Sequence, residues 1–569
     1  MNILVGGAWP YANGSLHIGH IAALLPGDIL ARYFRAKGYT VFFVSGSDCH
    51  GTPVTIRARQ ENKTPQEISD FYHNEFRDCF SRLGFSYDLY GKTSSEEHKS
   101  FIIEFHRKLY DGGYVYEKST PQAYCGKCRQ FLPDRFVKGL CPLCGESARG
   151  DQCEACGSVL EPENLLKATC SVCGDAPEFR PTNHLFLAIT RMKDELDNYI
   201  ESHSCWRKNA YEMSKRYIRE GLRDRSLTRD LDWGIDVPRD GFERKKIYIW
   251  AENVLGYISD CYTLCRQQGL DFNEFWNSSR QYYVHGKDNI PFHTIILTSL
   301  LLGRSDVKLK LPDEIISSEY LTLEGRKIST SGNWAIWVKD ILERYDPDSI
   351  RYFLISNGPE KRDTDFTWRE FINSHNGELL GAYGNFVNRS LVFIQKSFEG
   401  KVPETQSNPG CRGEQPGCMD EQQTRFATSQ AMLATSPDIL QLLIKLYPSV
   451  GSLIEQGSIK EALDTIFSFV RAANKFFDEE QPWITVKSDI EKCKETLNTC
   501  VQIIANLSLL LEPFLPFSSA KVRNILKIEK VKWQNVVIPA GLELGSVEIL
   551  FERVDKKVIQ EEETNLKER

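Results

Sequence analysis

The chain has 569 residues, of which 41% are hydrophobic and 26% are charged, a composition typical of a globular protein. At roughly 150 residues per domain, this length predicts several modules rather than one core. The net charge of -7 excludes a uniformly polycationic nucleic-acid binder, so any nucleic-acid partner must contact local basic patches.

The first residues show none of the patterns of a targeting signal. Met1 leads directly into the apolar run Ile3-Leu4-Val5, without a basic region or a long hydrophobic stretch. The sequence also lacks a run of about 18 apolar residues, which a membrane-spanning helix requires. These features favour the cytoplasm as the expected location.

The N-terminal region alternates strand and helix patterns. Ile3-Leu4-Val5 and Val41-Phe42-Phe43-Val44 are apolar runs typical of buried strands, and between them apolar residues recur at helical spacing. A strand, a helix and a strand form a βαβ unit. This unit predicts a Rossmann-like α/β fold whose parallel sheet binds ligands beyond the carboxyl ends of its strands.

The composition changes between Tyr116 and Pro181, where Cys, Gly and Pro dominate and no long amphipathic period persists. This change predicts an inserted module that is held together by metal ions. Apolar periodicity returns at Ile247-Tyr248-Ile249-Trp250 and at Tyr282-Tyr283-Val284, each of which we interpret as a strand followed by a helix. We therefore expect the insertion to split one α/β domain into two halves.

The last two fifths of the chain are predicted to be helical. Strand patterns fade after about residue 340, and amphipathic helices are expected over residues 370–396, 426–456, 460–480 and 489–512. Residues 401–423 are rich in Pro, Gly, Gln and Glu, which is typical of a disordered loop. A short apolar run, 547–551, precedes a highly charged tail that we expect to be frayed.

Eight of the seventeen cysteines form four C-x-x-C pairs, separated by twelve, eight and thirteen residues. In a large chain without a secretion signal, such pairs indicate metal binding rather than disulfides. Four thiolates at about 2.3 Å make a closed tetrahedral zinc site, so eight predict two structural zinc ions without a catalytic role. Redox-active or free thiols are the alternative. The pairs are Cys125/Cys128, Cys141/Cys144, Cys153/Cys156 and Cys170/Cys173.

A histidine motif, His17-Ile18-Gly19-His20, stands where the first loop meets the first helix. Gly19 lets the backbone approach a nucleotide, and the helix N-terminus favours phosphate. The two imidazoles can donate hydrogen bonds to phosphate oxygens as charge develops. Because the motif is short, two histidines that merely cap a helix are an equally simple interpretation.

A lysine motif, Lys327-Ile328-Ser329-Thr330-Ser331, follows Gly325-Arg326 about 300 residues later. A lysine on such a loop can reach the terminal phosphates of a nucleotide in the transition state. By itself the motif is also compatible with an ordinary solvated loop. The order and separation of the two motifs strengthen the interpretation of both as parts of a nucleotide site.

Together the two motifs resemble the H-I-G-H and K-M-S-K-S signatures of class I aminoacyl-tRNA synthetases, and their surroundings resemble the methionyl-tRNA synthetase family. The resemblance covers nearly the whole chain. The further matching stretches are Pro10 to Ser15, Asp48 to Pro53, D-R-F-V-K-G at Asp134 to Gly139, T-R-D-L-D-W-G at Thr228 to Gly234, Trp250 with Tyr257, and His285 to His293.

The resemblance implies a methionine pocket. Asp48 is expected to pair with the ammonium group of methionine, and aromatic walls suit the thioether because sulfur packs well against rings. Any one of these aromatic residues could instead be ordinary core. The expected methionine-binding residues are Trp9 (by its backbone), Tyr11, Asp48, Trp250, Asn253, Tyr257, Phe292 and His293.

The resemblance also implies an ATP site. Lys287 and Asp288 are expected to contact ATP, together with Gly19, His20, Lys327 and Ser329. Arg229 is expected to stabilise charge in the adenylation transition state, alongside His17, His20 and Lys327. Magnesium should accompany ATP.

Two residues depart from the family pattern. Thr330 stands where the family usually has a second lysine, so phosphate stabilisation is expected to depend more on Arg326 and Lys327. Asn253 stands where the family often has a small residue. Its larger polar side chain either reshapes the methionine pocket or faces away from it.

For tRNA, the resemblance implies that Asn385, Arg389 and Trp483 read the CAU anticodon, by stacking and by hydrogen bonds to unpaired bases. Packing at the end of the bundle is the alternative for Trp483. The segment Arg207–Arg229 holds eight Lys or Arg against three acids, which fits either a solvated helix face or contact with the acceptor stem. The family also suggests nested zinc ligands, with the two inner cysteine pairs sharing one ion, although spacing alone leaves consecutive pairing open.

These inferences predict a methionine–tRNA ligase that forms methionyl-adenylate and pyrophosphate and then charges the terminal ribose of tRNA(Met), for initiation and elongation. The protein is expected to be a monomer. The expected division is 1–114 and 229–325 for the two catalytic halves, 115–228 for the zinc-binding insertion, 326–380 for the lysine loop and linker, 381–545 for the anticodon-binding helices and 546–569 for the tail.

Three rival functions fit parts of the sequence. A synthetase for leucine, isoleucine or valine shares the two signatures, but usually carries an editing insertion of about two hundred residues. A small nucleotidyltransferase with a similar histidine motif predicts neither the helical region nor the zinc module. A zinc-ribbon nucleic-acid-binding protein leaves the motifs at residues 8–20, 46–53 and 285–293 unexplained.

Overall fold

The computed structural model describes residues 1–133, 136–150, 153, 155, 156, 158, 160–330, 332–405 and 436–568. The described chain forms two compact units, which we call the first and the second unit. The first contains Met1–Phe34, Tyr39–Arg344 and Pro359–Asp365, and the second contains Arg35–Gly38, Tyr345–Gly358 and Phe366–Arg569. Among the described residues, every helix is too short or too polar to cross a bilayer.

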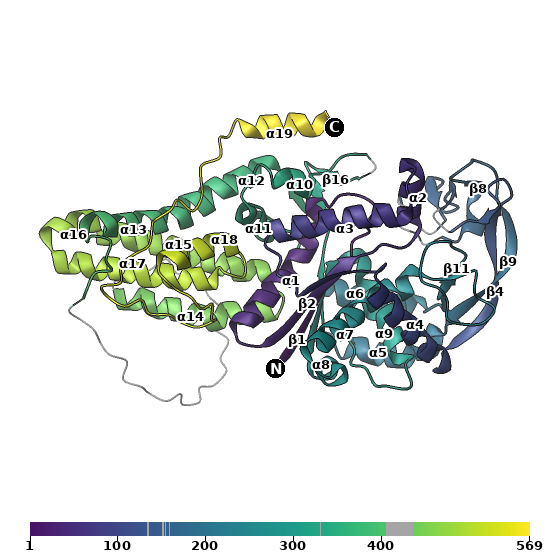
Figure 1. Ribbon diagram of the computed structural model, residues 1–569. Coiled ribbons are helices and arrows are strands. Elements are labelled where there is room, and N and C mark those ends of the chain that lie inside the picture. The colour runs from purple at the N-terminus through teal and green to yellow at the C-terminus, as the bar shows by residue number, and fades with distance from the viewer. Residues whose placement is uncertain are drawn as a thin grey trace. The chain divides into compact units, whose positions relative to one another are not determined.

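Strands β1 and β2, labelled in Figure 1, belong to the five-stranded parallel sheet on which the first unit is built, with the order β14-β13-β1-β2-β3. This confirms the predicted Rossmann-like α/β fold. The strand order reverses between β1 and β13, the point at which such sheets bind ligands. The strands are β1 (Asn2–Gly7), β2 (Thr40–Ser47), β3 (Leu89–Lys92), β13 (Arg280–Gly286) and β14 (Glu314–Ser318).

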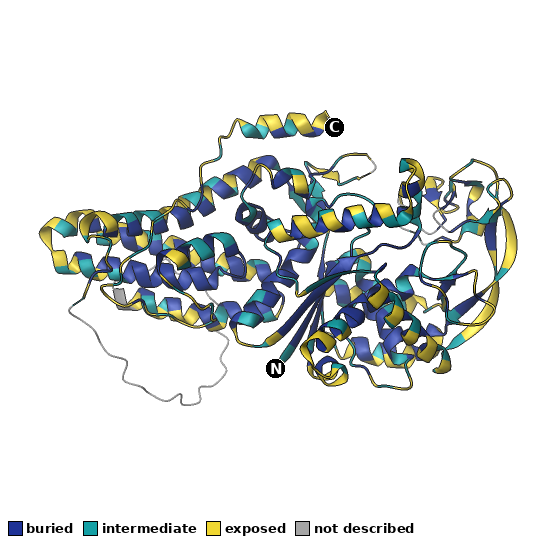
Figure 2. Ribbon diagram, viewed as in Figure 1, coloured by how far each residue is buried: buried dark blue, intermediate teal, exposed yellow. Residues whose placement is uncertain are grey.

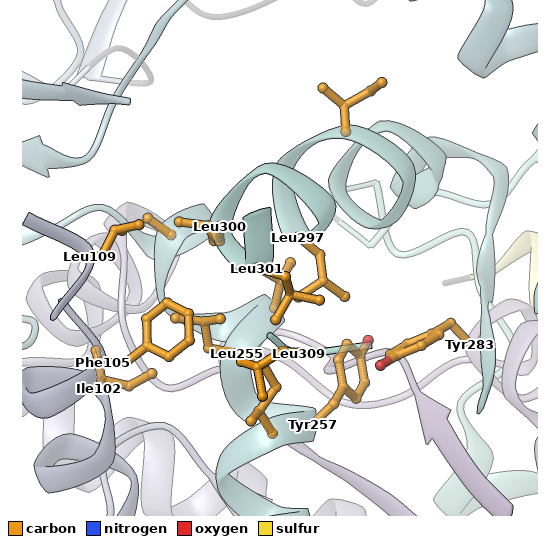
Figure 3. Close-up of a cluster of buried hydrophobic side chains, with 14 of the residues drawn as sticks. Ile102, Phe105, Leu109, Leu255, Tyr257, Tyr283, Leu297, Leu300, Leu301 and Leu309 are labelled. Carbon is orange, nitrogen blue, oxygen red and sulfur yellow. The ribbon is translucent and has the colours of Figure 1, made fainter. Parts of the chain in front are cut away.

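Helices connect these strands and bury their apolar faces against the sheet, whose central strands are buried along most of their length (Figure 2). Ile102, Phe105 and Leu109 on α4 belong to one apolar cluster (Figure 3). The cluster also contains Leu255, Leu297, Leu300, Leu301 and Leu309. The helices are α1 (Ile18–Ala36), α2 (Thr52–Glu61), α3 (Pro65–Arg82), α4 (Glu96–Asp111), α7 (Gly256–Gln268), α8 (Phe272–Ser278), α9 (Thr298–Leu302) and α10 (Val338–Ile341).

The insertion leaves the sheet as a long antiparallel ribbon of β4 (Val115–Cys125) and β9 (Glu178–Leu187). β5 (Gln130–Phe131) and β10 (Arg225–Ser226) flank the ribbon. A separate three-stranded sheet contains β6 (Val137–Leu140), β7 (Ser147–Arg149) and β8 (Leu166–Cys170). The chain then returns through α5 (Lys193–Glu201), α6 (Lys208–Glu220), β11 (Thr228–Arg229) and β12 (Lys246–Ile247).

The prediction of a strand over Ile247–Trp250 is wrong in its extent. The strand β12 ends at Ile247, and two short 3-10 turns, Ile249–Ala251 and Asn253–Leu255, lead into α7. The apolar run arises because Ile247 and Ile249 are core residues while Trp250 lines a pocket. Periodicity alone cannot separate a buried turn from a buried strand.

The second unit is helical, as predicted, and its helices α11 and α17 are buried along most of their length. Its helices include α11 (Pro347–Ser356), α12 (Trp368–Ser374), the π-helix η8 (His375–Gly384), α13 (Asn385–Ser397), α14 (Ser436–Glu455), α15 (Ile459–Glu480), α16 (Pro482–Ser488), α17 (Ile490–Leu510) and α18 (Pro516–Ile525). Most of the expected loop over 401–423 lies outside the described residues.

The prediction of a frayed tail is wrong. Val558–Lys567 forms helix α19, in which Glu562 and Leu566 are buried. The phenol of Tyr345 donates a hydrogen bond to Glu562 Oε1 at 2.8 Å. A highly charged segment can therefore be ordered when one of its acidic side chains accepts a buried hydrogen bond and one of its leucines packs into the core.

Gly46 of β2 provides a test of packing around the indole of Trp9. A Cβ at position 46 would lie 2.5 Å from the Trp9 ring and 2.6 Å from the carbonyl oxygen of Gly91. We expect Gly46→Ala to destabilise the first unit by about 1–3 kcal/mol, because overpacking forces backbone shifts. In thermal unfolding, Gly46→Ala should lower the transition temperature of the first unit. Gly377→Ala is the control, because a Cβ there meets no atom within 4 Å, and it should leave this temperature unchanged.

Candidate functional site

The carboxyl edge of the parallel sheet collects the polar loops of the first unit. Asp48 follows β2 directly, Lys287 follows β13, and Glu319 follows β14. The loop after β1 pairs with the end of β2, because Asp48 N–H donates to Pro10 O (2.9 Å) and Ala12 N–H donates to Asp48 O (2.8 Å). The sheet therefore brings residues far apart in sequence to one edge.

The histidine motif forms the first turn of α1. The Gly19 N–H donates to His17 Nδ1 and the His17 N–H donates to His20 Nδ1, both at 3.1 Å, and the two rings stack with centroids 3.8 Å apart. Burial lowers the pKa of His20 to about 4, and burial together with His20 lowers that of His17. Both imidazoles are therefore neutral at pH 7, and each has its Nε2 as the protonated nitrogen.

The lysine motif lies beside the histidine motif. Ile18 N–H donates to Ile336 O (3.1 Å) and Val338 N–H donates to Leu16 O (2.8 Å). In the hairpin of β15 (Leu321–Leu323) and β16 (Arg326–Lys327), Lys327 is exposed. The neighbouring Ile328 side chain is 3.4 Å from the position of a Cβ on Gly19. Ser329 pairs with Trp334, and Ser331 lies outside the described residues.

An aromatic pocket opens near the same edge. The rings of Trp250 and Phe292 stack at 3.6 Å, and Tyr11 meets Trp250 edge-on at 6.3 Å. A small cavity of about 60 Å³ is lined by Tyr11 and Trp250 together with His50 and Arg229. Phe292 begins a π-helix, Phe292–Leu297, a form that is frequent at functional sites.

Tyr257 and His293 form a hydrogen-bonded pair beside this pocket. His293 Nδ1 donates to Asn289 O (2.8 Å), so its Nε2 accepts from the Tyr257 hydroxyl (2.9 Å). Burial lowers the pKa of His293 to about 4, which keeps the ring neutral. Tyr257 also packs edge-on against Tyr283 of the apolar cluster, so one residue belongs to both core and site (Figure 3).

Asp48 is completely buried and accepts two hydrogen bonds. Asn253 Nδ2 donates to Oδ2 at 2.7 Å, and His50 N–H donates to Oδ1 at 3.3 Å. Burial raises the pKa of Asp48 well above its usual range, and the charge of Glu252 raises it further. A cationic group at this carboxylate would relieve both effects.

Two residues of this cluster, Glu252 and His50, are absent from the predicted site. His50 Nδ1 lies 2.5 Å from Glu252 Oε1, and both side chains are buried. The ring of His50 meets Trp233 edge-on at 5.1 Å, and Trp233 donates to Cys49 O at 2.8 Å. His50 stands in the matched stretch Asp48 to Pro53, which was the available signal, whereas no motif pointed to Glu252.

The remaining predicted residues of the first unit have other contacts. Lys287 is held by Glu319 Oε2 (2.8 Å) and Asp363 Oδ1 (2.7 Å), and Asp288 accepts a hydrogen bond from Tyr320. The guanidinium of Arg229 lies 3.8 Å from the centre of the Tyr248 ring. The side chain of Trp9 is buried beside Gly46 and Gly256. Lys287 is therefore engaged by acids in this state.

The eight paired cysteines form two clusters in nested order. Cys125, Cys128, Cys170 and Cys173 make one cluster, and Cys141, Cys144, Cys153 and Cys156 make the other, with all sulfur atoms of a cluster within 4.8 Å of one another. Sulfur ligands at about 2.3 Å from a tetrahedral zinc ion would be about 3.8 Å apart. The measured contacts of 3.4–3.9 Å fit that spacing. Of the matching stretch between the first two cysteine pairs, Asp134 and Arg135 lie outside the described residues.

The three predicted anticodon residues belong to the second unit. Asn385 is exposed at the start of α13, and Arg389 lies one turn later. Arg389 pairs with Asp478 at 2.7 Å and lies 5.7 Å from the ring centre of Trp483, whose side chain is 42% exposed. An exposed indole beside a guanidinium is suited to stacking on unpaired bases.

Comparison with known proteins agrees with this architecture. Residues 3–391 match the model of "tRNA synthetases class I (M)", and residues 438–569 match "Anticodon binding domain of methionyl tRNA ligase". The chain is 50% identical to "Methionine--tRNA ligase 1" of Alkaliphilus oremlandii, covering 99% of each chain. It is 51% identical to "Methionine--tRNA ligase" of Bacillus cereus, covering 99% of this chain and 98% of the relative.

A solved structure has the same fold. It is Mycobacterium tuberculosis methionyl-tRNA synthetase in complex with methionyl-adenylate, with a TM-score of 0.78, 21% identity, and coverage of 97% of this chain and 100% of the other. The Rossmann-like sheet with its two adjoining signature motifs thus defines a class I aminoacyl-tRNA synthetase. Within that class, the chain belongs to the methionine–tRNA ligase family.

The backbone contacts of the site predict histidine tautomers. In ¹⁵N-histidine NMR, we expect His17 and His20 to carry the proton on Nε2 and His293 to carry it on Nδ1. Because burial lowers the pKa of His20 and His293 to about 4, neither should titrate between pH 5.5 and 8. A midpoint near 6.5, or protonated Nδ1 on His17 or His20, would contradict the geometry.

Proposed function

We propose that the first unit activates L-methionine with ATP, giving methionyl-adenylate and pyrophosphate, and then transfers methionine to the 3'-terminal ribose of tRNA(Met) for initiation and elongation. The methionine carboxylate attacks the α-phosphorus in line, and the ribose hydroxyl then attacks the activated carbonyl. The observation that carries the proposal is the pairing of residues 16–18 with 336–338, which joins both signature motifs beside the aromatic pocket.

In the amino-acid half of the site, Asp48 pairs with the methionine ammonium group. Its carboxylate is buried and already hydrogen-bonded on both oxygens, so a cation gains a strong partner at small reorganisation cost. Tyr11, Trp250 and Phe292 enclose the thioether, because sulfur packs favourably on ring edges and faces. Tyr257 with His293, Asn253 and the Trp9 backbone complete the pocket.

In the nucleotide half, neutral imidazoles donate from Nε2 to phosphate oxygens. His17 and His20 have this proton arrangement because their Nδ1 atoms accept backbone N–H groups. Gly19 lets the nucleotide approach the backbone. Lys327 reaches the β- and γ-phosphates from its exposed hairpin, Ser329 supports them, and Arg229 faces the reacting carboxylate from the pocket wall.

Two further residues bind ATP, and a metal ion accompanies it. Lys287 must exchange at least one of its acidic partners, Glu319 and Asp363, for a nucleotide oxygen, and Asp288 lies beside it. ATP brings Mg²⁺, which neutralises phosphate charge. The protein itself contributes orientation and fixed dipoles, and no covalent enzyme intermediate is needed.

The second unit reads the tRNA. Trp483 stacks on an anticodon base, while Asn385 and Arg389 hydrogen-bond base edges. We assign the anticodon-binding domain to 381–545 and the tail to 546–569, after a lysine loop and linker at 326–380. The insertion at 115–228 separates catalytic halves at 1–114 and 229–325. We further propose a cytoplasmic monomer, because the partner of the family is tRNA and one chain carries every assigned residue.

The two cysteine clusters bind structural zinc. Each supplies four thiolates, which closes the coordination sphere and leaves no position for a substrate. The N–H of Cys128 donates to Cys125 Sγ at 3.3 Å, a contact that stabilises a thiolate. Because cysteines make up much of the apolar cluster of the module, zinc supplies a large share of its folding energy.

ATP–pyrophosphate exchange tests the function. Exchange should depend on methionine, whereas leucine and cysteine should give little at the same concentration. Lys327→Ala should slow exchange about a hundredfold or more while methionine binding changes little, because one transition-state donor is lost. Lys308→Ala, an exposed lysine outside the site, is the matched control. Exchange driven by another amino acid would overturn the function, and normal kinetics in Lys327→Ala would remove that lysine from its role.

Metal analysis tests the zinc assignment. Elemental analysis of the purified protein should give two zinc ions per chain, one for each cluster. The double variant Cys144→Ser/Cys156→Ser should retain one ion, because the outer cluster keeps all four ligands. Loss of both ions in this variant, or retention of both, would contradict two independent clusters.

A further inference from the structure

The turn between β12 and α7 carries two adjacent polar side chains, which follow the pocket residue Trp250. Glu252 is 0% exposed and Asn253 is 7% exposed, and they stand between the pocket residue Trp250 and the helix that carries Tyr257. Buried polar groups are costly unless they have partners. The contacts of this pair therefore show which groups the turn positions.

Asn253 contacts Asp48 directly. Its amide nitrogen donates to Asp48 Oδ2 at 2.7 Å, within the range of a strong charge-assisted hydrogen bond. The larger side chain at this position thus faces the carboxylate rather than solvent. It holds one oxygen in place and stabilises the charged form of the group.

Glu252 acts on the same carboxylate from another side. Its Oε1 lies 2.5 Å from His50 Nδ1, and the backbone N–H of His50 donates to Asp48 Oδ1. Its Oε2 is buried without a hydrogen-bond partner among the described residues. Glu252 therefore fixes the segment 48–50 through His50, and it places a second acid in the dry surroundings of Asp48.

We propose that Glu252 and Asn253 are positioning residues that act through Asp48 on the ammonium group of methionine, Asn253 supporting its negative charge and Glu252 opposing it. This inference rests on the proposed function and deepens it. Because the two residues act on the charge of Asp48 in opposite directions, its carboxyl group becomes fully charged only when a cation binds. Glu252 and Asn253 therefore set the affinity for methionine and the pH below which methionine binding is lost.

The direction of each effect follows from elementary electrostatics. The hydrogen bond from Asn253 lowers the pKa of Asp48, and the charge of Glu252 raises it, while burial raises it most. Other titratable groups near Asp48 are Tyr11, which pairs with it along the backbone, Cys49, and His50, with His98 Nε2 4.0 Å from Glu252. Only charged Asp48 binds an ammonium group, so kcat/KM for methionine must fall at low pH.

The experiment compares two variants of the full chain. In methionine-dependent exchange between pH 5 and 9, Asn253→Ala should move the acid limb of kcat/KM for methionine upward by about one pH unit. Glu252→Gln keeps an acceptor for His50 but removes the charge, so it should move the limb downward by a similar amount. KM for ATP should change less than twofold in both. Asn498→Ala, which removes a partly buried amide contact to Pro403 O in the second unit, should keep the wild-type profile.

The opposite directions separate this role from simple structural damage, which would lower activity at every pH. If Asn253→Ala does not fold, Asn253→Ser retains a donor and should give a smaller upward shift. Limbs that stay in place, or that move in the same direction in both kinds of variant, would overturn the inference while leaving the function intact. Absence of methionine-dependent exchange in the wild type would overturn the proposed function and this inference with it.

Discussion

The backbone hydrogen bonds between residues 16–18 and 336–338 are the contact on which the site depends. They join the start of α1, at the central strand of the sheet, to the segment that follows the lysine hairpin. Because both partners are main chain, the contact is specified by the fold rather than by particular side chains. In the proposed function, this contact lets the histidines and the lysine act on one substrate, although about 300 residues separate them in sequence.

The amino-acid half obeys a different constraint, the cost of burying charge. Asp48 has no exposure, and the role that we propose for it requires a charged carboxylate when a cation binds. The protein meets this cost with two donors on its oxygens and with a pocket whose other walls are aromatic. The same burial that raises the pKa of Asp48 would also strengthen its attraction for the ammonium group that we propose it binds.

Local patterns were sufficient to predict much of the fold. The runs at 3–5, 41–44 and 282–284 are strands of one parallel sheet, because continuous apolar runs between turns are typical of strands buried on both faces. The cysteine spacing also predicts two metal-binding clusters, because each C-x-x-C pair places two sulfur atoms on one turn. The nested grouping needed the fold, which brings β4 and β9 together.

The remaining features depend on contacts between distant segments. No pattern marked Glu252, because its partner His50 stands 202 residues away. The order in the C-terminal tail depends on contacts with distant residues, among them the hydrogen bond from Tyr345 to Glu562 and those between Asn376 and Val554, which composition cannot show. For Asn253 the sequence left two orientations open, and the structure turns it toward Asp48. The catalytic and anticodon roles of the predicted residues stay predictions.

The position of β1 in the sheet has a consequence for synthesis on the ribosome. β1 pairs with β2 early, but its other edge is covered by β13, whose first residue is Arg280. At a synthesis rate of about 5–20 residues per second, roughly 14–55 s pass before β13 is made and can pair with that edge. A nascent chain with an unpaired apolar strand edge is prone to association during that interval. The long insertion therefore prolongs the period in which the emerging polypeptide benefits from chaperones.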